Sequence, residues 1–167
     1  MRGRKTEVYE QLIIYIQEHQ ADFYRIAASY LKNPEDAMDA VQNAVCKALE
    51  KYKTIRQPEF LKTWFYRILV NECQMMLRNR KKEVLTDEED TWDIPSTEGV
   101  FSEEDYQLYQ EVMLLPEKLK TVILLRFYED MALKEIADIT ETNLSTVKTR
   151  LYQALKILKI QIEGDFL

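Results

Sequence analysis

The side chains best suited to chemistry lie between residues 144 and 158, where cations, hydroxyls and an amide recur and no acidic residue occurs. Val147, Leu151 and Leu155 recur every four residues, which predicts one buried helix face and leaves the polar residues on the opposite face. Cations bind phosphates, and hydroxyl and amide groups can read base edges, so this helix is predicted to bind DNA. The predicted contacts are Ser145, Thr146, Lys148, Thr149, Arg150, Tyr152, Gln153 and Lys156.

Two further clusters, both in the first half of the chain, have residue types that suit binding. Between residues 60 and 78 aromatic and basic residues mix, and this combination suits single-stranded DNA, because rings hold unstacked bases and cations hold the backbone. Trp64 and Phe65 fit a buried core equally well. Asp36, Asp39 and Asn43 are spaced three and four apart, so they share one helical face that can dock on a basic protein surface.

The elements that must position these clusters are all predicted to be helices. Only three glycines and four prolines occur, which disfavours turn-rich β architecture. Asn33-Pro34 is typical of a helix start. A short helix, a turn and a second helix near the carboxyl end predict a helix-turn-helix, whose second helix enters the major groove. Helices are predicted over 8–31 with a break near His19, then over 34–52, 59–81, 103–114, 116–129 and 133–139, and from 143 to about 158.

Charge divides the chain into two predicted domains and a linker. Residues 1–82 hold 15 Lys/Arg and 10 Asp/Glu, a net of +5, whereas residues 83–111 hold 11 acids and no Lys or Arg. Residues 83–102 lack helical periodicity and contain Pro95 and Gly99, so we predict a flexible acidic linker there. The predicted domains are 1–82 and 103–167, giving an all-α protein of two small helical domains.

Several function classes have no support in the sequence. No apolar run reaches the roughly 18 residues of a membrane span, and no signal peptide is recognisable, so a cytoplasmic protein without membrane insertion is expected. The sequence has no glycine-rich phosphate loop, no histidine-centred triad and no metal-ligand spacing, so we expect no catalytic residue, no metal and no cofactor. Cys46 and Cys73 are expected to be small buried apolar residues.

The motifs resemble those of a known family, the extracytoplasmic-function (ECF) RNA polymerase sigma factors of the sigma-70 family. LPEKLKTVILLRFYEDMALKEIADI followed by NLSTVKTRLYQALKIL resembles the family's domain four, which binds minus-35 DNA. Residues 24–49 resemble its region that binds core polymerase, and residues 60–78 resemble its minus-10 region. The resemblance implies core-polymerase contacts at Asp36, Asp39, Gln42 and Asn43. It implies minus-10 contacts among Arg56, Phe60, Lys62, Thr63, Trp64, Tyr66, Arg67 and Asn71.

The resemblance also implies partners and leaves some alternatives open. The implied partners are bacterial RNA polymerase core, promoter DNA and an anti-sigma factor, which in this family is often membrane-anchored. Asn43 replaces the usual Glu. Glu141 stands where a turn glycine is common, so the turn there is expected to be either strained or built differently. The alternatives are a helix-turn-helix regulator that acts without polymerase, an enzyme, and a helical adaptor. The role of the first 20 or so residues stays open.

Overall fold

The structure is a computed structural model that describes residues 3–83 and 103–158. The chain separates into two compact units, Met1–Ile94 and Pro95–Leu167. The described residues contain helices and turns and no strand, which confirms the predicted all-α class. The predicted linker lies outside the described residues, apart from its first residue, Glu83.

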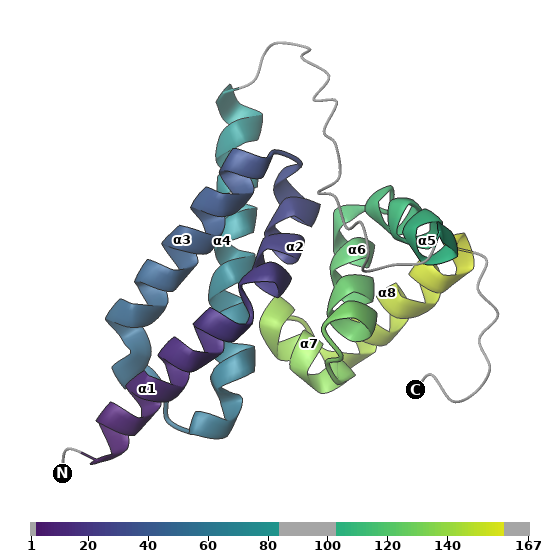
Figure 1. Ribbon diagram of the computed structural model, residues 1–167. Helices are drawn as coiled ribbons and strands as arrows, with labels where there is room; N and C mark the ends of the chain where they lie inside the picture. Colours follow the sequence, from purple (N-terminus) through teal and green to yellow (C-terminus); the bar gives the residue numbers. More distant parts are fainter. Residues whose placement is uncertain (1–2, 84–102, 159–167) are drawn as a thin grey trace. The chain divides into compact units, whose positions relative to one another are not determined.

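The first unit is a bundle of four α-helices (Figure 1). The helices α2, α3 and α4 pack on one another, while α1 packs against the turn that follows α3. Two short 3₁₀ turns, η1 and η2, connect α3 to α4, where the sequence predicts only a loop. The elements are α1 (Gly3–Glu18), α2 (Gln20–Leu31), α3 (Pro34–Lys51), η1 (Tyr52–Thr54), η2 (Pro58–Phe60) and α4 (Leu61–Glu83).

Local chemistry explains where these helices begin and end. The predicted break occurs at His19, whose ring Nδ1 donates to the carbonyl of Tyr15 at 2.9 Å. Lys32 ends α2 in the left-handed region, with φ of 54°. The Asn33 side chain then accepts hydrogen bonds from the backbone N–H of Glu35 and Asp36, at 2.9 and 3.3 Å, which caps α3. The predicted cap is therefore confirmed.

Aromatic rings fill the core of the first unit. Phe23 of α2 and Phe65 of α4 are fully buried, and their ring centroids are 4.4 Å apart. Tyr66 also lies in this core, 5.5 Å from Phe23 in a T-shaped arrangement. Each such burial contributes about 1.5–3 kcal/mol from the apolar area removed from water. The aromatic core therefore holds α4 against α2 and fixes which residues of α4 face outward.

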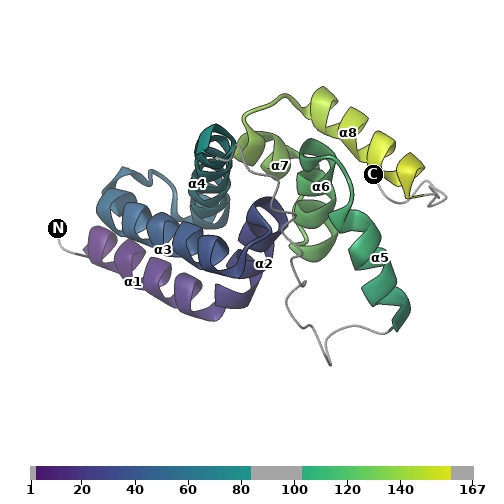
Figure 2. The ribbon, with the colours of Figure 1, turned by 90° about the horizontal axis from the view of Figure 1, so that it is seen from above.

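The second unit contains the predicted helix-turn-helix (Figure 2). Buried aliphatic side chains from η3, α7 and α8, such as Leu124, Ile136 and Leu151, fill its core. Glu141 ends α7 with φ of 56°, in the left-handed region, as expected for a turn that usually has glycine. The elements are α5 (Glu103–Met113), α6 (Glu117–Ile123), the π-helical turn η3 (Leu124–Tyr128), α7 (Leu133–Thr140) and α8 (Leu144–Ile157).

Two further expectations, one about a helix and one about the cysteines, differ from the structure. The predicted uninterrupted helix over 116–129 widens at η3, where the N–H of Glu129 donates to the carbonyl of Leu124, five residues back. Cys73 is buried as expected, but Cys46 is exposed, because it lies on the outward face of α3. The prediction that both cysteines are buried was therefore wrong for Cys46. No helix in the described ranges has both the length and the apolar character to cross a bilayer.

Candidate nucleic-acid interface

The exposed face of α8 carries the residues predicted to contact DNA. Val147, Leu151 and Leu155 are buried against the rest of the second unit, so the opposite face points outward. Thr146 and Arg150 are half-exposed at its edges. The structure thus brings the whole predicted set onto one surface. The exposed members of the set are Ser145, Lys148, Thr149, Tyr152, Gln153 and Lys156.

The turn before α8 fixes the position of its first residues. The Asn143 side chain accepts from the backbone N–H of Thr146 at 2.7 Å and caps the helix. The N–H of Thr142 donates to the carbonyl of Ala137 at 3.0 Å, which closes the end of α7. Thr149 Oγ1 donates to the carbonyl of Ser145 at 3.0 Å, so its oxygen lone pairs face outward as acceptors. The N-terminal turn of α8 is therefore presented in one defined orientation, as base reading requires.

A second exposed surface follows α4 from its start to Arg78 and includes four of the predicted minus-10 residues. Phe60 at the start of this line is 56% exposed, and Trp64 is half-buried. We call the line the α4 ridge, because its members recur every three or four residues and so share one face. The ridge consists of Phe60, Trp64, Arg67, Asn71, Met75 and Arg78.

Other residues of the minus-10 motif lie elsewhere. Lys62 is nine residues from Asn71, which on an α-helix places the two about 180° apart around the axis. Tyr66 is 1% exposed and belongs to the aromatic core, so the implied DNA contact of Tyr66 does not fit the structure. Arg56 is exposed in the segment between η1 and η2. The structure thus joins Phe60, Trp64, Arg67 and Asn71 and leaves Lys62 on another face.

The predicted polymerase-binding residues lie on α3 in two different settings. Asp39, Gln42 and Asn43 are exposed. Asp36 is half-buried, and its Oδ2 lies 2.5 Å from Nη2 of Arg80 in an ion pair that joins the start of α3 to the end of α4. Asp36 therefore has a structural contact within the unit, and the outward part of the surface consists of the other three.

A pocket between α3 and α4 was not predicted from the sequence. It has a volume of about 270 Å³. Lys47 and Lys51 come from α3, and the rest come from α4. Their spacing marks helix faces in the sequence, but only the antiparallel packing of α3 on α4 brings the cations together. The lining residues are Lys47, Lys51, Ile68, Asn71, Glu72, Met75 and Arg78.

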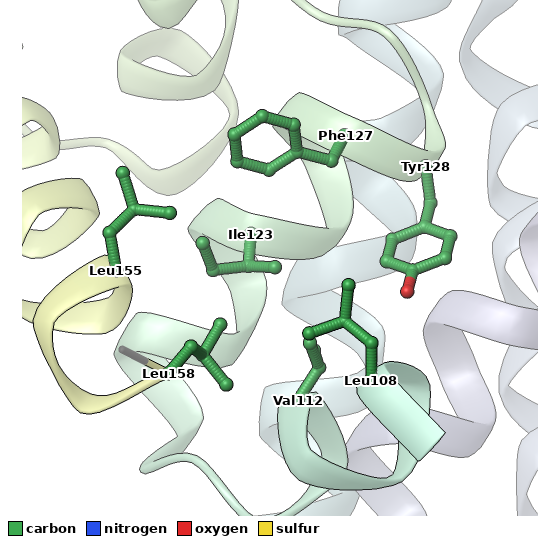
Figure 3. A pocket seen from close by; sticks show the side chains of 7 residues that line it. All are labelled: Leu108, Val112, Ile123, Phe127, Tyr128, Leu155 and Leu158. Carbon is green, nitrogen blue, oxygen red and sulfur yellow. The ribbon is translucent and has the colours of Figure 1, made fainter. Parts of the chain in front are cut away.

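The second unit contains an apolar pocket of about 230 Å³ (Figure 3). Residues from α5, α6, η3 and α8 line it, and Phe127 at its edge is 40% exposed. In the described part of the chain, no group of three His, Cys, Asp or Glu side chains could hold a metal ion. The pocket is lined by Leu108, Val112, Ile123, Phe127, Tyr128, Leu155 and Leu158.

Comparison with known proteins gives matches over both units. Residues 15–83 match the family model of sigma-70 region 2, and residues 106–158 match that of sigma-70 region 4. The chain is 46% identical over 162 residues to the RNA polymerase sigma factor SigV of Bacillus subtilis, covering 97% of each chain. It is 28% identical to the ECF RNA polymerase sigma-E factor of Haemophilus influenzae over 142 residues, covering 77% of this chain and 75% of that protein.

Solved structures with the same fold include two protein complexes. The sigma factor RpoE of Bartonella quintana, in complex with the anti-sigma factor NepR, aligns with a TM-score of 0.67 at 24% identity, covering 89% of this chain and 98% of that one. CnrH in complex with the cytosolic domain of CnrY aligns with a TM-score of 0.66 at 18% identity, covering 93% and 92%. These identities make the likeness one of fold.

Proposed function

This chain belongs to the sigma-70 family of RNA polymerase sigma factors, in its ECF group, and we propose how its two units share the work of promoter-specific transcription initiation. The first unit binds core polymerase and the melted minus-10 strand, and the second reads the minus-35 duplex. The observation that carries this division is the acid-free, cation-bearing face of α8, presented by a capped helix-turn-helix. The chain has no catalytic role of its own and acts in the cytoplasm beside polymerase.

The direct test is run-off transcription with purified core polymerase and genomic DNA. We expect the chain to confer synthesis from discrete start sites, whereas core polymerase alone gives none. Mapping the transcripts would also identify a promoter for the later experiments. Failure to produce start-site-selective transcripts on any template would overturn the proposal.

In the second unit, Lys148, Thr149, Tyr152 and Gln153 contact base edges, while Arg150 and Lys156 contact phosphates. Ser145 and Thr146 lie at the helix start, where N–H groups favour a phosphate. Lys148→Ala and Gln153→Ala should change the preference among minus-35 variants. Lys134→Ala on the exposed surface of α7 is the matched control. An unchanged preference in both variants would refute the base-reading assignment.

In the first unit, Asp39, Gln42 and Asn43 contact a basic surface of core polymerase, and Asp36 supports the start of α3 beside them. Asp39→Arg reverses a charge in the middle of this surface and should abolish copurification with core polymerase. Glu50→Arg, also exposed on α3 but three turns further along, should copurify normally. Equal association of both variants would rule out the contact.

The minus-10 strand lies along the α4 ridge, with Trp64 beside unstacked bases and Arg67, Asn71 and Arg56 on the backbone or base edges. Lys62, on another face of α4, makes at most a contact at the helix start. Arg67→Ala should therefore weaken binding of a melted promoter more than Lys62→Ala does. A larger effect of Lys62→Ala would contradict this arrangement.

The similar RpoE structure contains an anti-sigma factor, and we extend that class of partner to this chain. Such a factor would include an apolar segment that fits the pocket beside Phe127. A captured candidate should inhibit run-off transcription by the wild-type chain. Phe127→Asp should reduce that inhibition, and inhibition of equal strength would place the contact elsewhere.

A further inference from the structure

The pocket between α3 and α4 is positively charged, and the binding sites described so far give this charge no role. Three cations, Lys47, Lys51 and Arg78, line it with a single acid, Glu72. Glu72 is 3% exposed and forms an ion pair with Lys47 Nζ. The remaining two cations have no acidic partner among the described residues. The pocket therefore has a net positive charge at its opening.

Glu72 gives this pocket a fixed construction. A buried carboxylate is stable only with a partner, so Glu72 holds the Lys47 ammonium at the pocket wall. Each ammonium has three donors, and the Lys47 side chain is 42% exposed, so donors remain available toward the opening. Asn71 adds an amide from the α4 ridge. Ammonium, guanidinium and amide donors facing one opening are the groups that bind phosphate oxygens.

The residues that α4 contributes to the pocket follow one another along the helix and overlap the ridge. From Ile68 to Arg78 the helix rises about 15 Å at 1.5 Å per residue. Asn71, Met75 and Arg78 belong to both the ridge and the pocket. Proteins that bind single strands combine a basic groove, which follows the backbone, with nearby rings that stack on bases. Trp64 and Phe60 continue the same ridge and provide those rings.

We propose that this pocket binds backbone phosphates of the melted non-template strand, with Lys51 and Arg78 as the main contacts and Lys47 held by Glu72 as a third. The proposal rests on the proposed function, because polymerase must first open the duplex. It adds a backbone path on α3 to a site otherwise placed on α4 and the segment just before it. The strand then lies between the two helices, with its bases toward the ridge.

The test compares the wild type with the double variant Lys51→Gln/Arg78→Gln, each assembled with core polymerase. The DNA is a fork-junction fragment of a promoter mapped by run-off transcription, with the minus-10 non-template strand single-stranded. The dissociation constant of each holoenzyme for this DNA is measured over a series of KCl concentrations. Loss of two phosphate contacts should weaken binding and lower the slope of log affinity against log salt by about 1.4, at about 0.7 per contact.

Three controls make the result decisive. Lys5→Gln removes an exposed cation of α1 and should leave the slope unchanged. Lys51→Arg/Arg78→Lys keeps both charges and should keep the slope. The same promoter as a closed duplex distinguishes the source of the phosphates, because an equal loss of slope there would assign them to duplex DNA and overturn the proposal.

Failure of this inference and failure of the proposed function give different results. If wild-type holoenzyme makes no start-site-selective transcript, the proposed function fails. The other case is that wild-type holoenzyme makes such transcripts. If the double variant then copurifies with core polymerase and keeps the wild-type slope on fork-junction DNA, only the phosphate pocket is refuted.

Discussion

At the scale of single residues, the ion pair between Lys47 and Glu72 joins an exposed cation to a buried carboxylate. The carboxylate is almost fully buried, whereas the Lys47 side chain is 42% exposed. Removing the cation leaves an unpaired buried charge, which costs more than the pair itself contributes. Removing both charges together avoids that cost.

This difference predicts a measurable cycle of variants. Lys47→Met should lower the free energy of unfolding of the first unit by about 1–3 kcal/mol, since it leaves a buried carboxylate unsatisfied. Adding Glu72→Met should recover most of the loss. Urea unfolding followed by Trp64 fluorescence, in a Trp92→Phe background, reports on the first unit. A double variant less stable than Lys47→Met would contradict the prediction.

Glu141 is the second residue whose conformation predicts a stability change. A non-glycine residue with φ of 56° is strained, because its Cβ crowds the backbone. Glu141→Gly should stabilise the second unit by about 0.5–1 kcal/mol, measured by thermal unfolding of the full chain. Glu141→Ala keeps the strain and should show no such gain. Equal effects of glycine and alanine would show that the turn is not strained.

At the scale of elements, the cap of α8 connects stability to recognition. The Asn143 side chain satisfies the N–H of Thr146 at the start of the helix that we propose reads DNA. Asn143→Ala should destabilise the second unit by about 1 kcal/mol, and Asn143→Asp should retain most of the stability. Thermal unfolding by circular dichroism checks both. A stable alanine variant would mean that other contacts define the start of α8.

Local signals in the sequence were sufficient to predict most helix ends. Asn33-Pro34 and Asn143 act within one turn of chain, so their capping role is visible without a fold. The π-helical turn η3 was not predictable, because its wider hydrogen bonding is compatible with the same apolar spacing as an α-helix. The burial of Tyr66 was not predictable either, because its contact with Phe23 appears only in the folded unit.

The parts of the candidate site that lie on a single helix were predictable from the sequence, and the part formed by two helices was not. The exposed face of α8 follows from the buried positions of Val147, Leu151 and Leu155 within the same helix. The pocket between α3 and α4 needs Lys51 and Arg78 from helices that meet only in the folded unit. Spacing along a sequence cannot show which faces of two helices meet, so this part required the structure.

At the scale of the whole molecule, the chain as a whole repels DNA, whereas some of its surfaces attract it. The chain has a net charge of −6, while residues 1–82 have a net of +5 from 15 Lys/Arg and 10 Asp/Glu. Overall repulsion slows encounter with DNA, and local cations bind phosphates only once the surfaces are brought together. In the proposed function, core polymerase brings these surfaces to the DNA.

The two units should contribute independently to promoter affinity once polymerase holds them. Arg67 and Lys148 belong to different compact units and contact different DNA elements in the proposed function. Arg67→Ala and Lys148→Ala should each weaken binding of holoenzyme to fork-junction DNA, and the losses in the double variant should add within about 0.5 kcal/mol.

The dissociation constants of the wild type, the two single variants and the double variant are measured at one salt concentration. Lys134→Ala is a control that should leave the affinity for this DNA unchanged. Additive losses mean that each unit binds its element without altering the other. A coupling well above this margin would mean that minus-35 binding changes how the minus-10 strand is held, and it would refute independent units.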